Sequence, residues 1–214
     1  MNDSEYRRVA RWYDLLFDRV LGDLRSIGRG MVPLREGMAI LDVGCGTGAH
    51  LADYRDMGCD LYGIEPSPAM LEVARDRLGE AAHLSLGDAS RMPYPDGSFD
   101  LVMISMVLHE LDPTVRTSVM SEIRRCLKSA GHLLVIDYHA GPARSVKGRF
   151  YRAVIFVVER LAGQRHYRGF RDFIGTGGMP HLADEHHLDI LEDKVVGGGN
   201  FGVYLLRQAG DAAF

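Results

Sequence analysis

The sequence predicts an α/β fold with a doubly wound, mostly parallel sheet. Short apolar runs alternate with stretches of helical periodicity between residues 38 and 138. The apolar runs show little polar alternation, which is typical of strands covered on both faces. The first run, "MAILDVG", leads into glycines at alternate positions. Together these patterns indicate a sheet with helices on both faces and a ligand-binding turn after its first strand.

The stretches between the apolar runs carry helix start and stop signals. A first helix is expected over roughly 48–57, and a second from Ser67 to Leu78, where Ser67 is a suitable N-cap. A third begins at Asp112 and is expected to end at Gly131. The later strands are predicted at "CDLYGIE", "HLSLGD", "FDLVMIS" and "HLLVIDY", and "LDILEDKVV" with "NFGVYLLR" predicts a closing β-hairpin.

Composition limits the classes of protein to consider. A chain of 214 residues, 46% hydrophobic and 25% charged, predicts one domain over residues 1–214. A net charge of -4 argues against a nucleic-acid partner for the whole surface. The cysteines show no paired spacing, the N-terminus lacks an apolar leader, and no window approaches the ~20 apolar residues of a membrane span. A cytoplasmic protein is therefore expected.

Acidic residues follow most of the predicted strands. In an open α/β sheet, ligands bind beyond the carboxyl ends of the strands. Those positions hold Asp42, Glu65, Asp88 and Asp137, with Ser105 after the fourth strand. The sequence therefore predicts a site rich in carboxylates at this edge of the sheet.

The spacing of these acids indicates a nucleoside with a positive charge. Asp42 directly precedes the glycines, which suits a cationic group better than a phosphate. Glu65 lies 21 residues beyond Gly44, where an acid typically binds the ribose hydroxyls, and Asp88 can accept from an adenine amine. A nicotinamide-dependent oxidoreductase is the alternative, although the glycines run GxGxG and not GxGxxG. Each feature alone is more often a tight turn or a helix cap.

Three stretches, "ILDVGCGTGAHL", "LYGIEPSPAML" and "GDASRMPYPDGSFDLVMISMVLHEL", closely resemble successive motifs of the class I S-adenosylmethionine-dependent methyltransferases. The chain is most similar to the branch that contains the ubiquinone and menaquinone C-methyltransferases, and "YRRVARWYD" resembles that branch's lid segment. The resemblance implies a Rossmann-like, seven-stranded, mostly parallel sheet with an antiparallel last strand. It also implies S-adenosyl-L-methionine as the cofactor and residues 1–32 as an N-terminal helical lid.

The resemblance also implies roles for individual residues. The loop under the methionine moiety comprises Asp42, Gly44, Gly46, Thr47 and Gly48. Glu65 holds the ribose, Asp88 and Ala89 face the adenine, and Ser105 lies beside the methyl group. Tyr13 of the lid closes over the cofactor, or is plain core at helical spacing.

The acceptor side is less defined by the sequence. His109 in "VLHEL" is the candidate general base, needed only for a protonated nucleophile, and its alternative is a helix-start residue bonded to backbone. Asp137, Tyr138 and His139 are alternative acceptor contacts. The histidines His181, His186 and His187 lack a metal signature, so they are interpreted as solvated and no metal site is expected.

Residues 141–171 combine eight basic side chains and one acid with the apolar stretch "FYRAVIFVVERLAG". One interpretation is a basic and apolar helical insertion, 141–180, over the acceptor site, whose apolar helix covers a hydrophobic substrate and whose arginines meet an anionic headgroup or a membrane surface. The other is a core-packed helix with a solvated basic face. The oligomeric state is left open.

The expected function is an S-adenosylmethionine-dependent methyltransferase for a small, apolar acceptor such as a quinol precursor or a lipid. "MVLHEL" departs from the glycine-leucine-arginine-asparagine run of the quinone branch, so a quinol acceptor is not specified. A non-catalytic module that binds S-adenosylmethionine is a further alternative.

Overall fold

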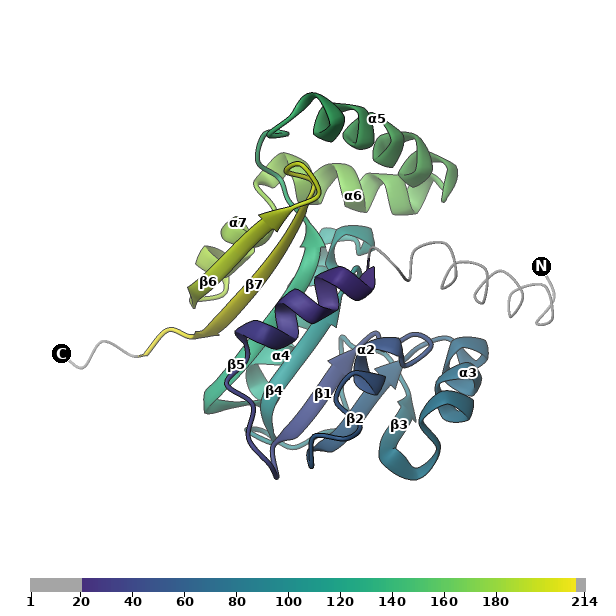
Figure 1. Ribbon diagram of the computed structural model, residues 1–214, viewed down its shortest axis with the longest axis vertical. Helices are drawn as coiled ribbons and strands as arrows, with labels where there is room; N and C mark the ends of the chain where they lie inside the picture. Colours follow the sequence, from purple (N-terminus) through teal and green to yellow (C-terminus); the bar gives the residue numbers. More distant parts are fainter. Residues whose placement is uncertain (1–20, 211–214) are drawn as a thin grey trace.

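The computed structural model describes residues 21–210, and its centre is one seven-stranded sheet (Figure 1). The strands lie in the order β3-β2-β1-β4-β5-β7-β6. The first five are mutually parallel, and β7 is antiparallel to both of its neighbours, as predicted. Their bounds are β1 Ala39–Val43, β2 Asp60–Glu65, β3 Ala82–Leu86, β4 Phe99–Ser105, β5 Leu127–Tyr138, β6 Leu188–Val196 and β7 Phe201–Gln208.

Helices cover both faces of the sheet because successive strand residues point to opposite sides. Ile40 packs with a helix over residues 21–31, with α2 (Ala49–Ala52) and with α3 (Pro68–Leu78). Leu41, its neighbour, packs on the other face with α4 (Pro113–Cys126), α6 (Gln164–Thr176) and α7 (Met179–Glu185). The remaining helices are α5 (Val146–Leu161) and the short 3-10 turns η1 (Gly79–Ala81) and η2 (Leu108–Glu110).

Local helix signals were accurate at some ends and wrong at others. Ser67 caps α3, since its side chain accepts from the backbone N of Met70 at 3.4 Å. The helix after Asp112 ends at Cys126, however, and not at Gly131. Leu127 pairs with Phe99 of β4, so the neighbouring strand extends β5 at the expense of the helix. The helix expected over 48–57 is likewise shorter, and turns follow Ala52.

Helix α5 stacks on α6 at one end of the molecule (Figure 1), and many of its apolar side chains face solvent. Phe150, Val157 and Leu161 are 67%, 59% and 81% exposed. Its inner face instead carries Arg152, which donates to the carbonyl of Gly141 at 2.6 Å, and buried Glu159. Helix α5 is core-packed only in part, because most of its large apolar side chains are exposed. The inner face is therefore mixed: Ile155 and Phe156 pack against the core, while Arg152 meets open backbone carbonyls, which require donors.

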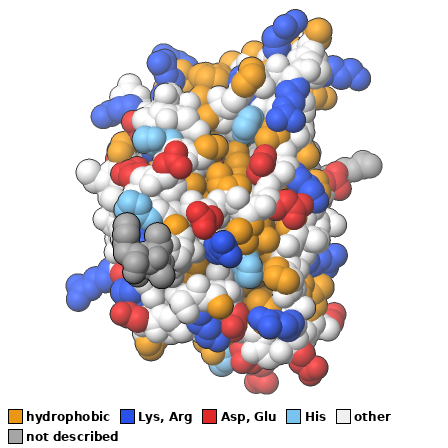
Figure 2. All heavy atoms as spheres, turned by 90° about the vertical axis from the view of Figure 1, so that its left-hand side faces the viewer, with side chains coloured by type: hydrophobic (Ala, Val, Ile, Leu, Met, Phe, Trp, Pro, Cys, Tyr) orange, Lys and Arg blue, Asp and Glu red, His pale blue; other side chains and the backbone are white. Residues whose placement is uncertain are grey.

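The exposed apolar side chains of α5 recur at helical spacing and have basic neighbours. Figure 2 shows orange and blue side chains side by side at the upper end of the molecule, where Figure 1 draws α5. The exposed apolar residues of this helix are Val146, Phe150, Tyr151, Val154, Val157, Val158 and Leu161. We call this surface the α5 stripe. Within residues 21–210, no helix has both the length and the apolar character needed to cross a membrane.

Candidate active site

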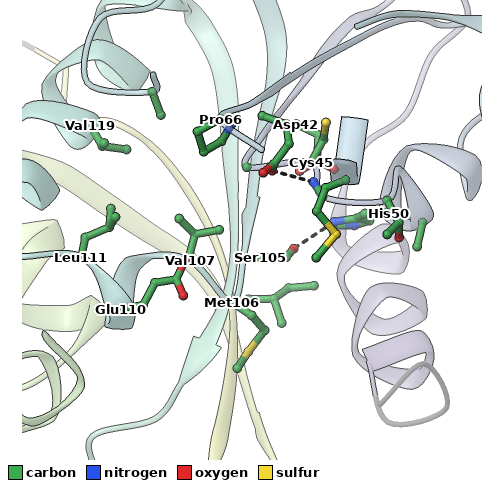
Figure 3. A pocket seen from close by; sticks show the side chains of 18 of the residues that line it. Asp42, Cys45, His50, Pro66, Ser105, Met106, Val107, Glu110, Leu111 and Val119 are labelled. Carbon is green, nitrogen blue, oxygen red and sulfur yellow. Dashed lines mark hydrogen bonds between the residues drawn. The ribbon is translucent and has the colours of Figure 1, made fainter. Parts of the chain in front are cut away.

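A cavity of about 500 Å³ opens at the carboxyl ends of β1, β2 and β4. Its volume lies in the range of small-molecule sites. Figure 3 shows Asp42 and His50 on one side of the cavity, and Val107, Leu111 and Val119, with Glu110 among them, on the other. The cavity is therefore suited to two ligands, or to one ligand with a polar and an apolar end.

The glycine loop after β1 needs glycine for steric reasons. Gly44 has φ +70°, and a Cβ there would lie 2.7 Å from Cγ2 of Val107. Gly48 has φ +73°, and its Cβ would meet Leu78 of α3 at 2.7 Å. At Gly44 the bare backbone thus lies beside Val107 of the cavity wall, while Gly48 packs closely against α3.

Glu65, at the end of β2, ties the loop to the start of α3. Its Oε2 accepts from the backbone N of Gly46 at 3.0 Å, and its Oε1 accepts from the backbone N of Ser67 at 3.0 Å. Burial raises its pKa, while these two hydrogen bonds act in the opposite direction. Each carboxylate oxygen has a second lone pair, so Glu65 can still accept from a diol such as a ribose.

Asp42 is buried beside the same loop and is 2% exposed. Burial, together with the nearby charge of Glu65, raises its pKa to about 8, although Arg25 acts in the opposite direction. A buried carboxylate of this kind is stabilised in its charged form by an opposite charge. The bare loop and Asp42 therefore fit the cationic amino-acid end of S-adenosylmethionine.

Of the other predicted cofactor residues, Thr47, Asp88 and Ala89 border the cavity, whereas Gly48 lies outside its lining. Thr47 is 5% exposed, and Arg77 of α3 donates to its carbonyl and its hydroxyl at 3.0 and 2.9 Å. Asp88 is exposed, with Oδ1 accepting from the backbone N of Ser90 at 2.8 Å, and Ala89 lies beside it in the wall. Tyr13 and most of the predicted lid lie outside the described residues. Of the segment 1–32, Leu21 and Arg25 contribute to the wall.

Ser105 is in the wall, but its partner was not predicted. Its Oγ lies 2.9 Å from Nδ1 of His50 in α2, and both side chains border the cavity (Figure 3). Burial, helped by Arg25, lowers the pKa of His50 to about 3, so this imidazole is neutral. The next residue, Met106, has φ +56°, which is an uncommon and strained conformation for a side chain of this type. Neither feature has a signature in the sequence.

His109 lies one layer behind the cavity and is 3% exposed. Its Nδ1 is 2.7 Å from Oδ1 of Asp137. The imidazole is therefore bonded to a carboxylate, and the alternative interpretation, in which it bonds to the backbone, was wrong. Asp137 is fully buried and also accepts from the backbone N of Tyr138 at 2.7 Å. Burial lowers the pKa of His109, but the charge and hydrogen bond of Asp137 outweigh it, and the pKa is raised overall.

His166 of α6, which the sequence did not single out, is the imidazole nearer to the cavity. It lines the wall together with Glu110 of η2. Its Nδ1 lies 3.3 Å from Oε2 of Glu110, and its Nε2 lies 2.5 Å from Oε2 of Glu159. These two hydrogen bonds raise the pKa of His166 to about 9. Only the packing of α6 against η2 reveals the pairing, because more than 50 residues separate them in sequence.

The remaining histidines lie elsewhere. His139 Nδ1 lies 2.9 Å from Tyr204 Oη. Tyr138, another predicted acceptor contact, donates its Oη to Oε1 of Glu159 at 2.7 Å. His181 of α7 and His187 just after it are exposed, as expected. His186 is only 5% exposed, so the expectation that it is solvated was wrong.

Comparison with known proteins points in the same direction. Residues 41–135 match the model of the methyltransferase domain. A demethylmenaquinone methyltransferase of Beutenbergia cavernae is 36% identical over 138 residues, which is 63% of this chain and 56% of the relative. The ubiquinone/menaquinone biosynthesis C-methyltransferase UbiE of Azotobacter vinelandii is 29% identical over 171 residues, 74% of this chain and 66% of the relative. The matches thus span between half and two thirds of these relatives.

Solved structures agree on the fold. A S-adenosylmethionine-dependent methyltransferase from Aquifex aeolicus superposes with a TM-score of 0.61 at 19% identity, covering 96% of this chain and 98% of that one. The [4+2]-cyclase SpnF superposes with a TM-score of 0.67 at 20% identity, covering 87% and 80%. Residues 41–135 thus match a methyltransferase domain, and the chain has the Rossmann-like fold of a solved S-adenosylmethionine-dependent methyltransferase.

Proposed function

We propose that the protein is an S-adenosylmethionine-dependent methyltransferase that acts on a small, apolar acceptor. The observation that carries the proposal is the cavity itself, which joins Asp42, Glu65 and the glycine loop to a wall made largely of apolar side chains. The matched domain and the methyltransferase relatives support the same activity.

Bound S-adenosylmethionine supplies a methyl group on a sulfonium, whose leaving thioether needs no proton. The chain's task is therefore to bind and to align. Glu65 holds the ribose, Asp88 and Ala89 meet the adenine, and Asp42 faces the positive charge. Such positioning can supply about 7–11 kcal/mol of the barrier.

An apolar acceptor is supported by the wall opposite the glycine loop, where Leu111, Val115 and Val119 meet. Hydrophobic side chains of this kind favour acceptors with aromatic or aliphatic surface. The names of the relatives support a quinol precursor, while a lipid or another apolar metabolite fits the same wall.

Calorimetry with S-adenosylmethionine, S-adenosylhomocysteine and NAD⁺ tests the cofactor. We expect binding of the first two and none of NAD⁺, because the GxGxG loop lies beside a buried carboxylate that opposes a pyrophosphate. Preference for NAD⁺ would overturn the proposal in favour of the oxidoreductase. Incubation of the bound protein with quinols and lipids, read by the appearance of S-adenosylhomocysteine, separates an enzyme from a module that only binds.

We also propose that the α5 stripe contacts an anionic membrane surface. The stripe is apolar and exposed, and Lys147, Arg149 and Arg160 are exposed on the same helix. An amphipathic helix with basic flanks binds anionic lipid through both apolar burial and charge. This contact would bring an apolar acceptor dissolved in the membrane close to the cavity.

A further inference from the structure

We propose that His109, Glu159 and His166 form a site for one divalent transition-metal ion, with zinc as its representative. The three residues come from η2, α5 and α6 and lie far apart in sequence. Each offers one ligand atom, and these atoms all lie within 4.8 Å of one another. Two imidazoles and one carboxylate are a common ligand set for catalytic zinc.

The distances between the ligand atoms are close to those that a metal requires. Ligands at about 2.0–2.2 Å from a tetrahedral zinc ion lie about 3.3 Å from one another. Here Oε2 of Glu159 is 3.8 Å from Nε2 of His109 and 2.5 Å from Nε2 of His166. The two values lie on either side of the required one, so small side-chain shifts suffice. The ion would take the place of the proton between Glu159 and His166 and of any proton on Nε2 of His109, and the displaced protons pass to solvent.

Each ligand also has an outer partner, as is usual around protein-bound metals. Nδ1 of His109 bonds to Asp137 at 2.7 Å, which directs its Nε2 toward Glu159. Nδ1 of His166 lies 3.3 Å from Glu110. The free oxygen of Glu159 accepts from Tyr138 Oη at 2.7 Å. In a metal site these partners would fix the tautomer and the orientation of each ligand.

The donor set also indicates which ion binds. Imidazole nitrogens suit zinc and neighbouring transition metals, whereas Mg²⁺ and Ca²⁺ prefer oxygen ligands. Three protein ligands leave a coordination position open. Of the three ligands, His166 lines the cavity, while buried His109 and Glu159 lie behind it, so the ion would lie just behind the cavity wall. An acceptor could reach the open position only from the His166 side, and only this last step rests on the proposed function.

Chelator-treated full-length protein titrated with Zn²⁺, and separately with Co²⁺, tests the site. We expect one ion per chain by elemental analysis, a rise in Tm, and visible absorption from Co²⁺. Glu159→Gln and His166→Gln should each weaken binding at least tenfold. His181→Gln, which removes an exposed imidazole of α7, should bind as the native protein does. An excess of Mg²⁺ should not compete.

Substoichiometric zinc, or the same binding in Glu159→Gln and His181→Gln, would overturn the proposal. Circular dichroism of each variant shows whether it has folded. Binding of S-adenosylmethionine to the metal-free protein is measured in parallel. If the cofactor binds and zinc does not, the metal site is wrong while the proposed function stands. If zinc binds and the cofactor does not, the proposed function is wrong while the metal site stands.

Discussion

Glu65 and Gly46 join the second strand to the glycine loop of the first, because the carboxylate accepts the backbone N–H of Gly46 at 3.0 Å. The other oxygen accepts from Ser67 at the start of α3. The acid that would hold a ribose therefore also fixes the shape of the loop beside it. A preorganised loop loses less conformational freedom when a ligand binds.

Replacing Glu65 should therefore weaken cofactor binding for two reasons, the loss of the ribose contact and the loss of the loop's support. Glu65→Ala removes two hydrogen bonds to a charged acceptor, each contributing about 1.5–3 kcal/mol, as well as the ribose contact. We expect affinity for S-adenosylmethionine to fall at least a hundredfold by calorimetry, with a lower Tm. Glu80→Ala removes an exposed acid of η1 and should change neither value. Equal affinities of the two variants would contradict the role of Glu65.

Asp42 makes the stability of the free protein depend on pH. Its pKa is about 8 in the folded state and 3.8 in a model compound, so the folded state retains a proton that the unfolded state loses. The free energy of unfolding should therefore decrease as pH rises from about 4 to 8. Asp42→Asn should lessen this decrease in urea unfolding at pH 5 and pH 8.

The same variant should bind S-adenosylmethionine poorly at pH 8, because an amide cannot offset the positive charge of the ligand. Asp60→Asn, which removes an exposed carboxylate at the start of β2, is the matched control. A stability profile that is the same in Asp42→Asn and native protein would show that Asp42 is ionised throughout.

Alanine substitutions at Gly44 and Gly46 distinguish the cost of a steric clash from the cost of a positive φ. Gly44→Ala brings a methyl group to 2.7 Å from Val107, in addition to the cost of positive φ. Gly46→Ala, at φ +52°, has nothing within 4 Å of its Cβ and bears the φ cost alone, about 1–2 kcal/mol. We expect the larger loss of Tm from Gly44→Ala. Adding Val107→Ala should restore part of it, and no recovery would rule out the contact as its cause.

The α5 stripe predicts retention of the protein by anionic vesicles. At low salt, sedimentation with vesicles of phosphatidylglycerol should retain the native protein, and neutral phosphatidylcholine should retain much less. Val157→Glu with Leu161→Glu should abolish retention. Leu191→Glu places the same charge on an exposed apolar position of β6 and should leave retention intact. Equal sedimentation of both variants would exclude the stripe as the contact.

The sequence alone predicted those features that a local pattern of residues determines. Apolar runs predict the strands, Ser67 predicts the start of α3, and the glycines after β1 predict the loop. Each of these signals depends only on residues that are close together in the chain. Asp42 and Glu65 follow from their places after strands, since parallel strands end at one edge of the sheet.

The tertiary structure decided everything that depends on residues distant in the chain. It ended α4 at Cys126 through pairing of β5 with β4, and it turned α5 with Arg152 and Glu159 inward. It also placed His166 beside Glu159 and Glu110, and His50 beside Ser105. A helical period shows that a helix has two faces, but only the atoms packed against each face decide which one is buried.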